Sequence, residues 1–185
     1  MATAGCVLVT KRLIVRNCIG ALGCAEDGFA QSVTGKGGMP RVLSGMLVEN
    51  VTKSLPPDWQ GDYSEERAMQ WMQEREKEGT TVLLCVEKEA KEPIGLMILF
   101  EMDYQGGGKE VRLGYLLREQ SWGKGFASEL IGAFVPWCRS VPSIRSIAGG
   151  VAKDNPASAR VLEKNGFHVS SEESTEHETM FRLEV

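Results

Sequence analysis

Histidine is scarce in this chain: only His168 and His177 occur among its 185 residues. The five cysteines are odd in number and form no Cys-x-x-Cys pair, so we expect neither a metal site nor a disulfide framework. A basic excess is also missing, because 21 lysines and arginines face 25 acidic residues and leave a net charge of −4. This charge balance does not favour nucleic-acid binding.

Long apolar segments are absent as well. The longest run, Ile94 to Phe100, is far too short to span a bilayer, and Met1 is not followed by the regions of a signal peptide. We therefore expect a cytoplasmic protein with no membrane contact. The length fits a single domain over residues 1–185, and 42% hydrophobic and 25% charged residues are ordinary for a globular fold.

Hydrophobic periodicity predicts a mixture of strands and helices. Strands are expected at 11–16, 81–87, 93–101, 110–117, 145–152, 167–169 and 178–183, and helices at 39–53, 64–79, 125–138 and 155–166. Ser64 and Asn155 are the expected N-caps of the second and fourth helices, and Pro136 is expected to kink or stop the third. Residues 17–38 give no assignable pattern. The order predicts an α/β (α+β) domain with helices on both faces of one sheet.

A glycine loop separates the strand expected at 110–117 from the next helix. Gly123 and Gly125 lack a Cβ, so the backbone can turn sharply and approach a ligand. The following helix N-terminus adds unpaired N–H groups and partial positive charge, which suit a pyrophosphate. The P-loop pattern fails because Gly125, not Ser or Thr, follows Lys124, and the dinucleotide pattern fails at Ser128. A nucleotide-binding domain is therefore disfavoured.

The segment Gln120-x-x-Gly123-x-Gly125-x-Ala127 resembles the acyl-CoA loop of the GNAT superfamily of N-acetyltransferases. Asn155 to Phe167 resembles the second signature of that family, in particular of its RimJ/RimL-like branch, and Thr10 to Arg16 resembles the opening strand of that branch. The resemblance implies a mostly antiparallel sheet of about six to seven strands, splayed at the acyl-CoA site. It also implies direct acetyl transfer from acetyl-CoA to a primary amine, in a protein N-terminus or a small molecule.

The resemblance gives most residues of these motifs a role. The implied cofactor-binding residues are Leu117, Gln120, Trp122, Gly123, Lys124, Gly125, Phe126, Ala127, Asn155 and Ser158. A backbone N–H at Leu116 or Leu117 would polarise the thioester carbonyl, and Ser158 would protonate the departing thiolate. The plainer alternatives are a tight turn before a helix, a helix cap at Asn155 and a small packed residue at Ser158.

The proton acceptor for the amine is less well determined. Glu101, Asp103 and Glu110 are candidates, and Glu110 is preferred because Arg112 stands where this branch often has an acid. Arg112 is instead a candidate for binding an acidic group of the substrate. It also favours the alternative of a non-catalytic acyl-CoA-binding module.

Two aromatic residues are candidates for the acceptor side. Trp59 follows a proline-rich break and is expected to line the acceptor pocket, whereas Trp71 has the spacing of a core residue. Tyr115 is a candidate for the acetyl pocket. The sequence leaves open whether the protein is a monomer or a homodimer.

Overall fold

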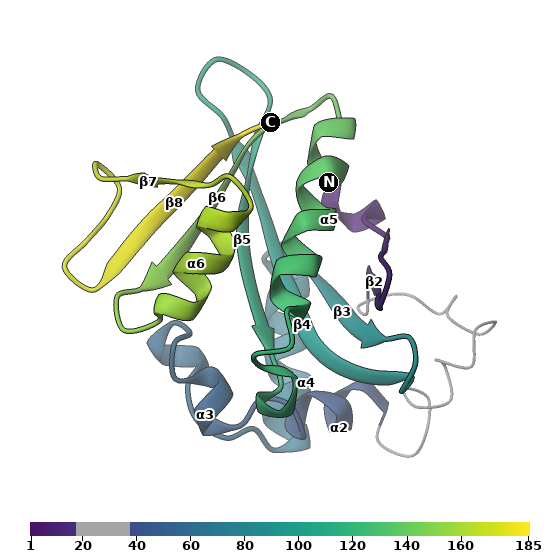
Figure 1. Cartoon of the computed structure of the whole chain (residues 1–185). Coiled ribbons are helices and arrows are strands. Elements are labelled where there is room, and N and C mark those ends of the chain that lie inside the picture. The colour runs from purple at the N-terminus through teal and green to yellow at the C-terminus, as the bar shows by residue number, and fades with distance from the viewer. Residues whose placement is uncertain (18–37) are drawn as a thin grey trace.

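A single mixed sheet organises the computed structural model, which describes residues 1–17 and 38–185 (Figure 1). The strands are β1 (Leu8–Val9), β2 (Leu13–Asn17), β3 (Thr81–Glu87), β4 (Glu92–Asp103), β5 (Lys109–Leu117), β6 (Ile144–Ala152), β7 (His168–Ser170) and β8 (Glu178–Glu184). Their order is β1-β2-β3-β4-β5-β6-β8-β7. Every pairing is antiparallel except that of β5 with β6. The expected mostly antiparallel sheet is confirmed, with eight strands instead of six or seven because β1 adds an edge.

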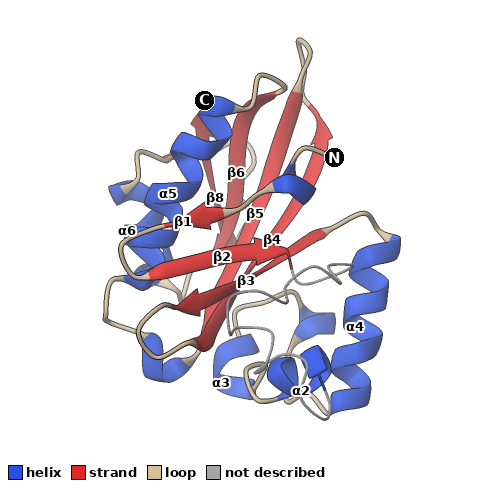
Figure 2. Ribbon diagram, turned by 90° about the vertical axis from the view of Figure 1, so that its right-hand side faces the viewer, coloured by secondary structure: helices blue, strands red, loops and turns tan. Residues whose placement is uncertain are grey.

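Helices cover both faces of this sheet (Figure 2). The α-helices are α2 (Gly38–Ser44), α3 (Glu49–Thr52), α4 (Glu65–Lys77), α5 (Phe126–Ser140) and α6 (Pro156–Lys164). The short 3-10 helices are η1 (Thr3–Gly5), η2 (Pro57–Trp59) and η3 (Glu119–Ser121). No helix within these described residues is long and apolar enough to cross a membrane.

The alternation of side chains along the strands divides the core into two layers. On β4, Met97 and Leu99 pack with α5, whereas Leu96 and Ile98 pack with Trp71 of α4. Successive strand residues point to opposite faces, so one strand serves both layers. Burying each large apolar side chain contributes about 1.5–3 kcal/mol. Both helical layers are therefore anchored through the same central strands.

The sheet opens between β5 and β6. Their parallel pairing covers only Lys109–Arg112 against 144–148, although β5 runs on to Leu117 and β6 to Ala152. We call the separated ends, residues 113–117 of β5 and 149–152 of β6, the strand gap. At its closed end the two backbones nearly touch, because a Cβ on Gly149 would lie 3.0 Å from the Leu113 carbonyl oxygen. Backbone groups of β5 that point away from β4 have no β6 partner along the gap.

Most expected elements appear, and two helix predictions need correction. The helix expected at 39–53 is two helices, α2 and α3, because the chain turns after Gly45 and buries both Met46 and Leu47. Pro136 does not stop α5, which continues to Ser140 while Phe134 and Cys138 around it are fully buried. Apart from its two end residues, the unassigned segment 17–38 lies outside the described residues.

Candidate active site

The glycine loop begins where β5 ends and leads directly into α5. Gly123 and Gly125 have φ angles of 72° and 80°, in the left-handed region that favours glycine. A Cβ on Gly123 would have no atom within 4 Å, so the loop is open on that side. Gly125 is the N-cap of α5, and no side chain caps the first turn. The free N–H groups and the helix dipole of this turn suit an anionic ligand such as a diphosphate.

Trp122 closes the start of the loop. Its indole Nε1 donates to the carbonyl oxygen of Leu117 at 2.7 Å, while its side chain remains 45% exposed. Gln120 and Lys124 are also exposed, whereas Phe126 is buried in the α5 layer and Ala127 packs against that layer. Phe126 is thus a core residue that could reach a ligand only through its main chain.

The turn at residues 10–13, which leads into β2, contacts the glycine loop and the first turn of α5. The Arg12 guanidinium donates through Nη1 to the Lys124 carbonyl oxygen at 2.9 Å and through Nε to Glu129 at 2.6 Å. The Thr10 hydroxyl and the Arg12 backbone N–H donate to the other Glu129 oxygen. Burial alone would raise the pKa of Glu129, but the hydrogen bonds from Thr10 and Arg12 outweigh it and lower the pKa. No pattern in the sequence indicates this contact, although Arg12 belongs to the opening-strand motif.

The start of α6 lies beside the strand gap. The Asn155 side-chain oxygen accepts a hydrogen bond from the Ser158 backbone N–H at 3.2 Å, which confirms the expected cap. Ser158 is half-buried on the first helical turn. The Asn155 amide NH₂ makes no hydrogen bond to another described residue, whereas the Ser158 hydroxyl lies beside the Tyr115 hydroxyl. The Asn155 amide is therefore available to a ligand.

Tyr115 projects from β5 toward the same helix. Burial raises the pKa of its hydroxyl, and the neighbouring Ser158 hydroxyl acts in the opposite direction. The two hydroxyls do not meet in good hydrogen-bonding geometry, so Tyr115 Oη is buried with no partner among the described residues. An unpaired buried hydroxyl is costly, and a ligand in the strand gap would give it a partner.

The opposite face of β5 carries an ionic cluster near the closed end of the gap. Glu110 is 3% exposed and receives Arg112 Nε at 2.7 Å on one oxygen and Arg182 Nη1 on the other. Glu173 bonds the second Nη of Arg182 at 2.8 Å and lies 3.5 Å from Arg112. Hydrogen bonding from Arg182 is the main cause that lowers the pKa of Glu173. Both oxygens of the preferred candidate base are thus held by arginines.

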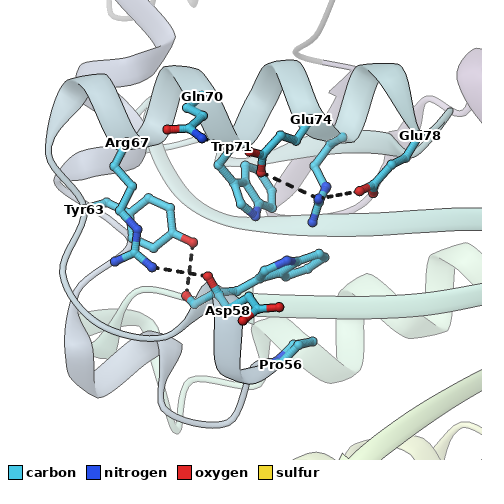
Figure 3. A pocket seen from close by; sticks show the side chains of 10 residues that line it. Pro56, Asp58, Tyr63, Arg67, Gln70, Trp71, Glu74 and Glu78 are labelled. Carbon is cyan, nitrogen blue, oxygen red and sulfur yellow. Dashed lines mark hydrogen bonds and ion pairs between the residues drawn. The ribbon is translucent and has the colours of Figure 1, made fainter.

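A pocket of about 560 Å³ lies between η2 and α4 (Figure 3). Trp59 is one of the residues that line it. Its ring meets Trp71 edge to face, with centroids 5.5 Å apart, and the Arg75 guanidinium lies 4.4 Å above it. Arg75 is itself 5% exposed and bonds Glu78 at 2.8 Å. The buried position of Trp71 confirms it as a core residue. No residue of β5 or of the glycine loop lines this pocket.

A family model for the acetyltransferase (GNAT) domain matches residues 40–168, which include the glycine loop and the Asn155 signature. The chain belongs to the GNAT acetyltransferase family. The resemblance read from the motifs is thereby confirmed, and acetyl transfer is the chemistry that this family performs. A search of curated protein sequences finds no match to this GNAT chain.

Solved GNAT structures share the whole fold. A GNAT-family acetyltransferase from Bacillus anthracis superposes with a TM-score of 0.69 at 16% identity, covering 97% of this chain and 98% of that one. RimL, a ribosomal L7/L12 alpha-N-protein acetyltransferase solved with coenzyme A, gives 0.68 at 17% identity, covering 97% and 98%. An acetyltransferase from Salmonella typhimurium that modifies the N-terminal serine of ribosomal protein L7/L12 also gives 0.68 at 17%, covering 97% and 99%. RimL enzymes thus stand among the neighbours, as the RimJ/RimL-like resemblance implied.

The fold brings the expected site residues of this GNAT domain into two groups. Leu117, Gln120 and residues 122–127 follow one another from the end of β5 through the loop into the first turn of α5, and Tyr115 meets Ser158 near the strand gap. Glu110, Arg112 and Leu116 share the face of β5 that looks toward α2–α4. Trp59 lies on that same side of the sheet, in the pocket beside α4.

Proposed function

We propose that this protein transfers the acetyl group of acetyl-CoA to a primary amine. The observation that carries the proposal is the open glycine loop with an uncapped helix turn, set directly beside a gap in the sheet. The structure of RimL was solved with coenzyme A, which supports the choice of ligand. The unpaired Tyr115 hydroxyl also supports the proposal, because a ligand in the strand gap would give it a hydrogen-bond partner.

Different parts of the chain would hold different parts of acetyl-CoA. The main chain of residues 123–127 binds the diphosphate, and Gln120 and Trp122 border it. Unpaired backbone of β5 along the gap binds the pantetheine arm, assisted by the Asn155 amide. This division follows from where each residue lies: anion-binding N–H groups at the helix end and strand-edge groups along the gap.

Acetyl-CoA supplies an activated acetyl thioester when it is bound. The Leu117 backbone N–H donates to the thioester oxygen, where negative charge develops as the amine attacks. The Leu116 N–H points the other way, toward Leu96 of β4, because the next alternate N–H, that of Arg118, bonds Ile94 of β4. A carbon–nitrogen bond forms, the carbon–sulfur bond breaks, and the Ser158 hydroxyl gives a proton to the departing sulfur. Holding both reactants in one orientation supplies much of the rate acceleration.

The acceptor side of the site rests on the α2–α4 face of the sheet. Arg112 and Trp59 remain predictions as acceptor contacts there, and Glu110 remains a prediction as the proton acceptor. Glu110 would have to release one guanidinium before it could take a proton. Because two neighbours are named as protein N-terminal acetyltransferases, we propose a protein N-terminus as the first acceptor to test, followed by small amines.

We propose that the protein is located in the cytoplasm and has no membrane or nucleic-acid partner. Among the described cysteines, Cys6 and Cys138 are free and buried, which is consistent with a reducing compartment. Burial raises the pKa of Cys6 to about 12, so its thiol stays protonated and unreactive at neutral pH.

Calorimetric titration with acetyl-CoA tests the proposal, with ATP and NAD as controls. We expect acetyl-CoA alone to bind, and then free thiol to appear when an N-terminal peptide or amine panel is added. If no ligand binds, the glycine loop is only a turn. If acetyl-CoA binds but no acceptor releases thiol, the chain is a non-catalytic acyl-CoA-binding module, the alternative that the Arg112–Glu110 pair favours.

A further inference from the structure

Arg12 joins the start of the chain to a loop 112 positions later in the sequence. Its guanidinium makes three different contacts: Nη1 with the Lys124 carbonyl oxygen, Nε with Glu129, and its flat face with the Phe126 ring, 4.3 Å from the centroid. Glu129 is in turn fixed by Thr10 and by the Arg12 backbone. The guanidinium therefore has a defined orientation, although its side chain is 39% exposed.

The Lys124 carbonyl determines where a neighbouring N–H points. In a trans peptide the C=O of one residue and the N–H of the next point in opposite directions, and no cis peptide occurs in the described chain. When the Lys124 carbonyl turns toward Arg12, the Gly125 N–H turns away from Arg12. Gly125 is the N-cap of α5, so this N–H joins the uncapped turn that faces the ligand.

This peptide needs an external restraint. Lys124 stands between Gly123 and Gly125, and glycine visits positive and negative φ with similar ease. The Lys124–Gly125 peptide leads into a glycine whose φ can change sign at low cost, and a flipped unit would present a carbonyl oxygen to an anion. The hydrogen bond from Arg12 favours one orientation, because a bond from a charged donor is stronger than a neutral one.

We propose that Arg12 is a positioning residue for acetyl-CoA, which fixes the Lys124–Gly125 peptide so that the Gly125 N–H meets the diphosphate. This inference rests on the proposed function, since it concerns the same ligand. The Arg12 Nη2 atom also lies 3.6 Å from where a Gly125 Cβ would be, so the guanidinium is directly beside the loop. Lysine is no substitute, because a single ammonium cannot bond Lys124 and Glu129 in this fork and stack on Phe126.

Two acetyl donors test this role, one with a diphosphate (acetyl-CoA) and one without (acetylpantetheine). Arg12→Ala should weaken acetyl-CoA binding by about tenfold, the equivalent of one charged hydrogen bond. The affinity for acetylpantetheine, measured by NMR titration, should be the same in Arg12→Ala as in the unmodified protein. Arg12→Lys keeps the charge and most of the stem, and it should not restore acetyl-CoA affinity.

Lys11→Ala is the matched control, because it removes the same charge from the adjacent exposed residue. Acetyl-CoA affinity should stay within twofold of the unmodified protein. The inference is overturned if Arg12→Ala binds acetyl-CoA normally, if Arg12→Lys restores binding, or if Lys11→Ala weakens it equally. Equal loss of both donors in Arg12→Ala would show a general structural role and would also overturn it. Failure of the unmodified protein to bind acetyl-CoA would instead refute the proposed function.

Discussion

The hydroxyl groups of Tyr115 and Ser158 lie next to each other although they come from different elements, the end of β5 and the first turn of α6. Both residues border the strand gap, and the Tyr115 hydroxyl is buried with no well-formed hydrogen bond to any described residue. A buried hydroxyl without a partner, next to a second hydroxyl, suits a ligand that has polar atoms.

Tyr115→Phe should raise stability and weaken ligand binding together. The hydroxyl is buried without a partner, so its removal should increase the free energy of unfolding by up to about 1 kcal/mol. Acetyl-CoA affinity should fall, because the ligand loses a hydrogen bond. Urea unfolding and calorimetry measure the two effects. A less stable variant would mean that the hydroxyl is already satisfied in the free protein.

Ser158→Ala should lower turnover while sparing acetyl-CoA affinity, since the hydroxyl would act on the departing sulfur. The backbone N–H of this residue bonds Asn155, and alanine keeps that cap. Steady-state kinetics and calorimetry on the same preparation separate the two effects. Unchanged turnover would assign the proton to another donor, such as water.

Gly123→Ala should reduce acetyl-CoA affinity at least tenfold, because it strains the left-handed loop and places a methyl group on the ligand side. Gly106→Ala is a matched control in the β4–β5 turn, since its φ is also positive and its Cβ would likewise meet no atom within 4 Å. Both variants should lose about 1 kcal/mol of unfolding free energy. Equal effects of both variants on affinity would refute the assignment of the loop.

Glu110→Gln should destabilise the fold by about 2 kcal/mol, because Arg112 and Arg182 lose a shared buried carboxylate and keep only Glu173. Asp103→Asn is the surface comparison: Asp103 bonds Lys109 at 2.7 Å, but its side chain is 91% exposed. That variant should unfold like the unmodified protein. The pH profile of turnover then tests catalysis, since loss of its acid limb in Glu110→Gln would identify this carboxylate as the base.

Acid should weaken the hydrogen bonds by which Thr10 and Arg12 hold Glu129, which we call the Arg12–Glu129 brace. Hydrogen bonds hold the pKa of Glu129 below the ordinary value of about 4.3 for a free glutamate. A lowered folded-state pKa means that the brace contributes its full stability above about pH 4.3 and loses it as the pH falls through the lower value. Glu129→Gln should therefore show a shallower loss of stability between pH 5 and pH 3, measured by urea unfolding. Parallel pH dependences would show that Glu129 is unperturbed.

Local signals were enough to predict much of this molecule. Ser64 and Asn155 cap helices as their sequence context implied, and β3 spans the residues that its β-branched run indicated. The loop at 120–127 could be recognised because its chemistry lies in contiguous residues. Such features depend on neighbours a few positions away, which a single sequence displays.

Long-range partners could not be predicted in the same way. Arg12 and Glu129 are 117 positions apart, and Glu110 meets Arg182 at a separation of 72. The hydrophobic periodicity around these residues does not specify which carboxylate pairs with which arginine, because the pairing depends on the order of the strands in the sheet. The break after Gly45 is similar, because it depends on burying Met46 and Leu47 in a core layer with strand residues far along the chain.

The short parallel contact between β5 and β6 divides the sheet into two blocks of strands, and each block carries a different part of the candidate site. One block is β1–β5 and the other is β6, β8 and β7; only four residue pairs of the ladder connect them. The glycine loop follows the last strand of the first block, whereas Asn155 and Ser158 follow the first strand of the second. A ligand that contacts both therefore cross-links two halves that the backbone joins weakly. Ligand binding across the strand gap therefore raises the free energy of unfolding of the sheet. The same separation of strands that opens the site thus makes the stability of the protein depend on whether the site is occupied.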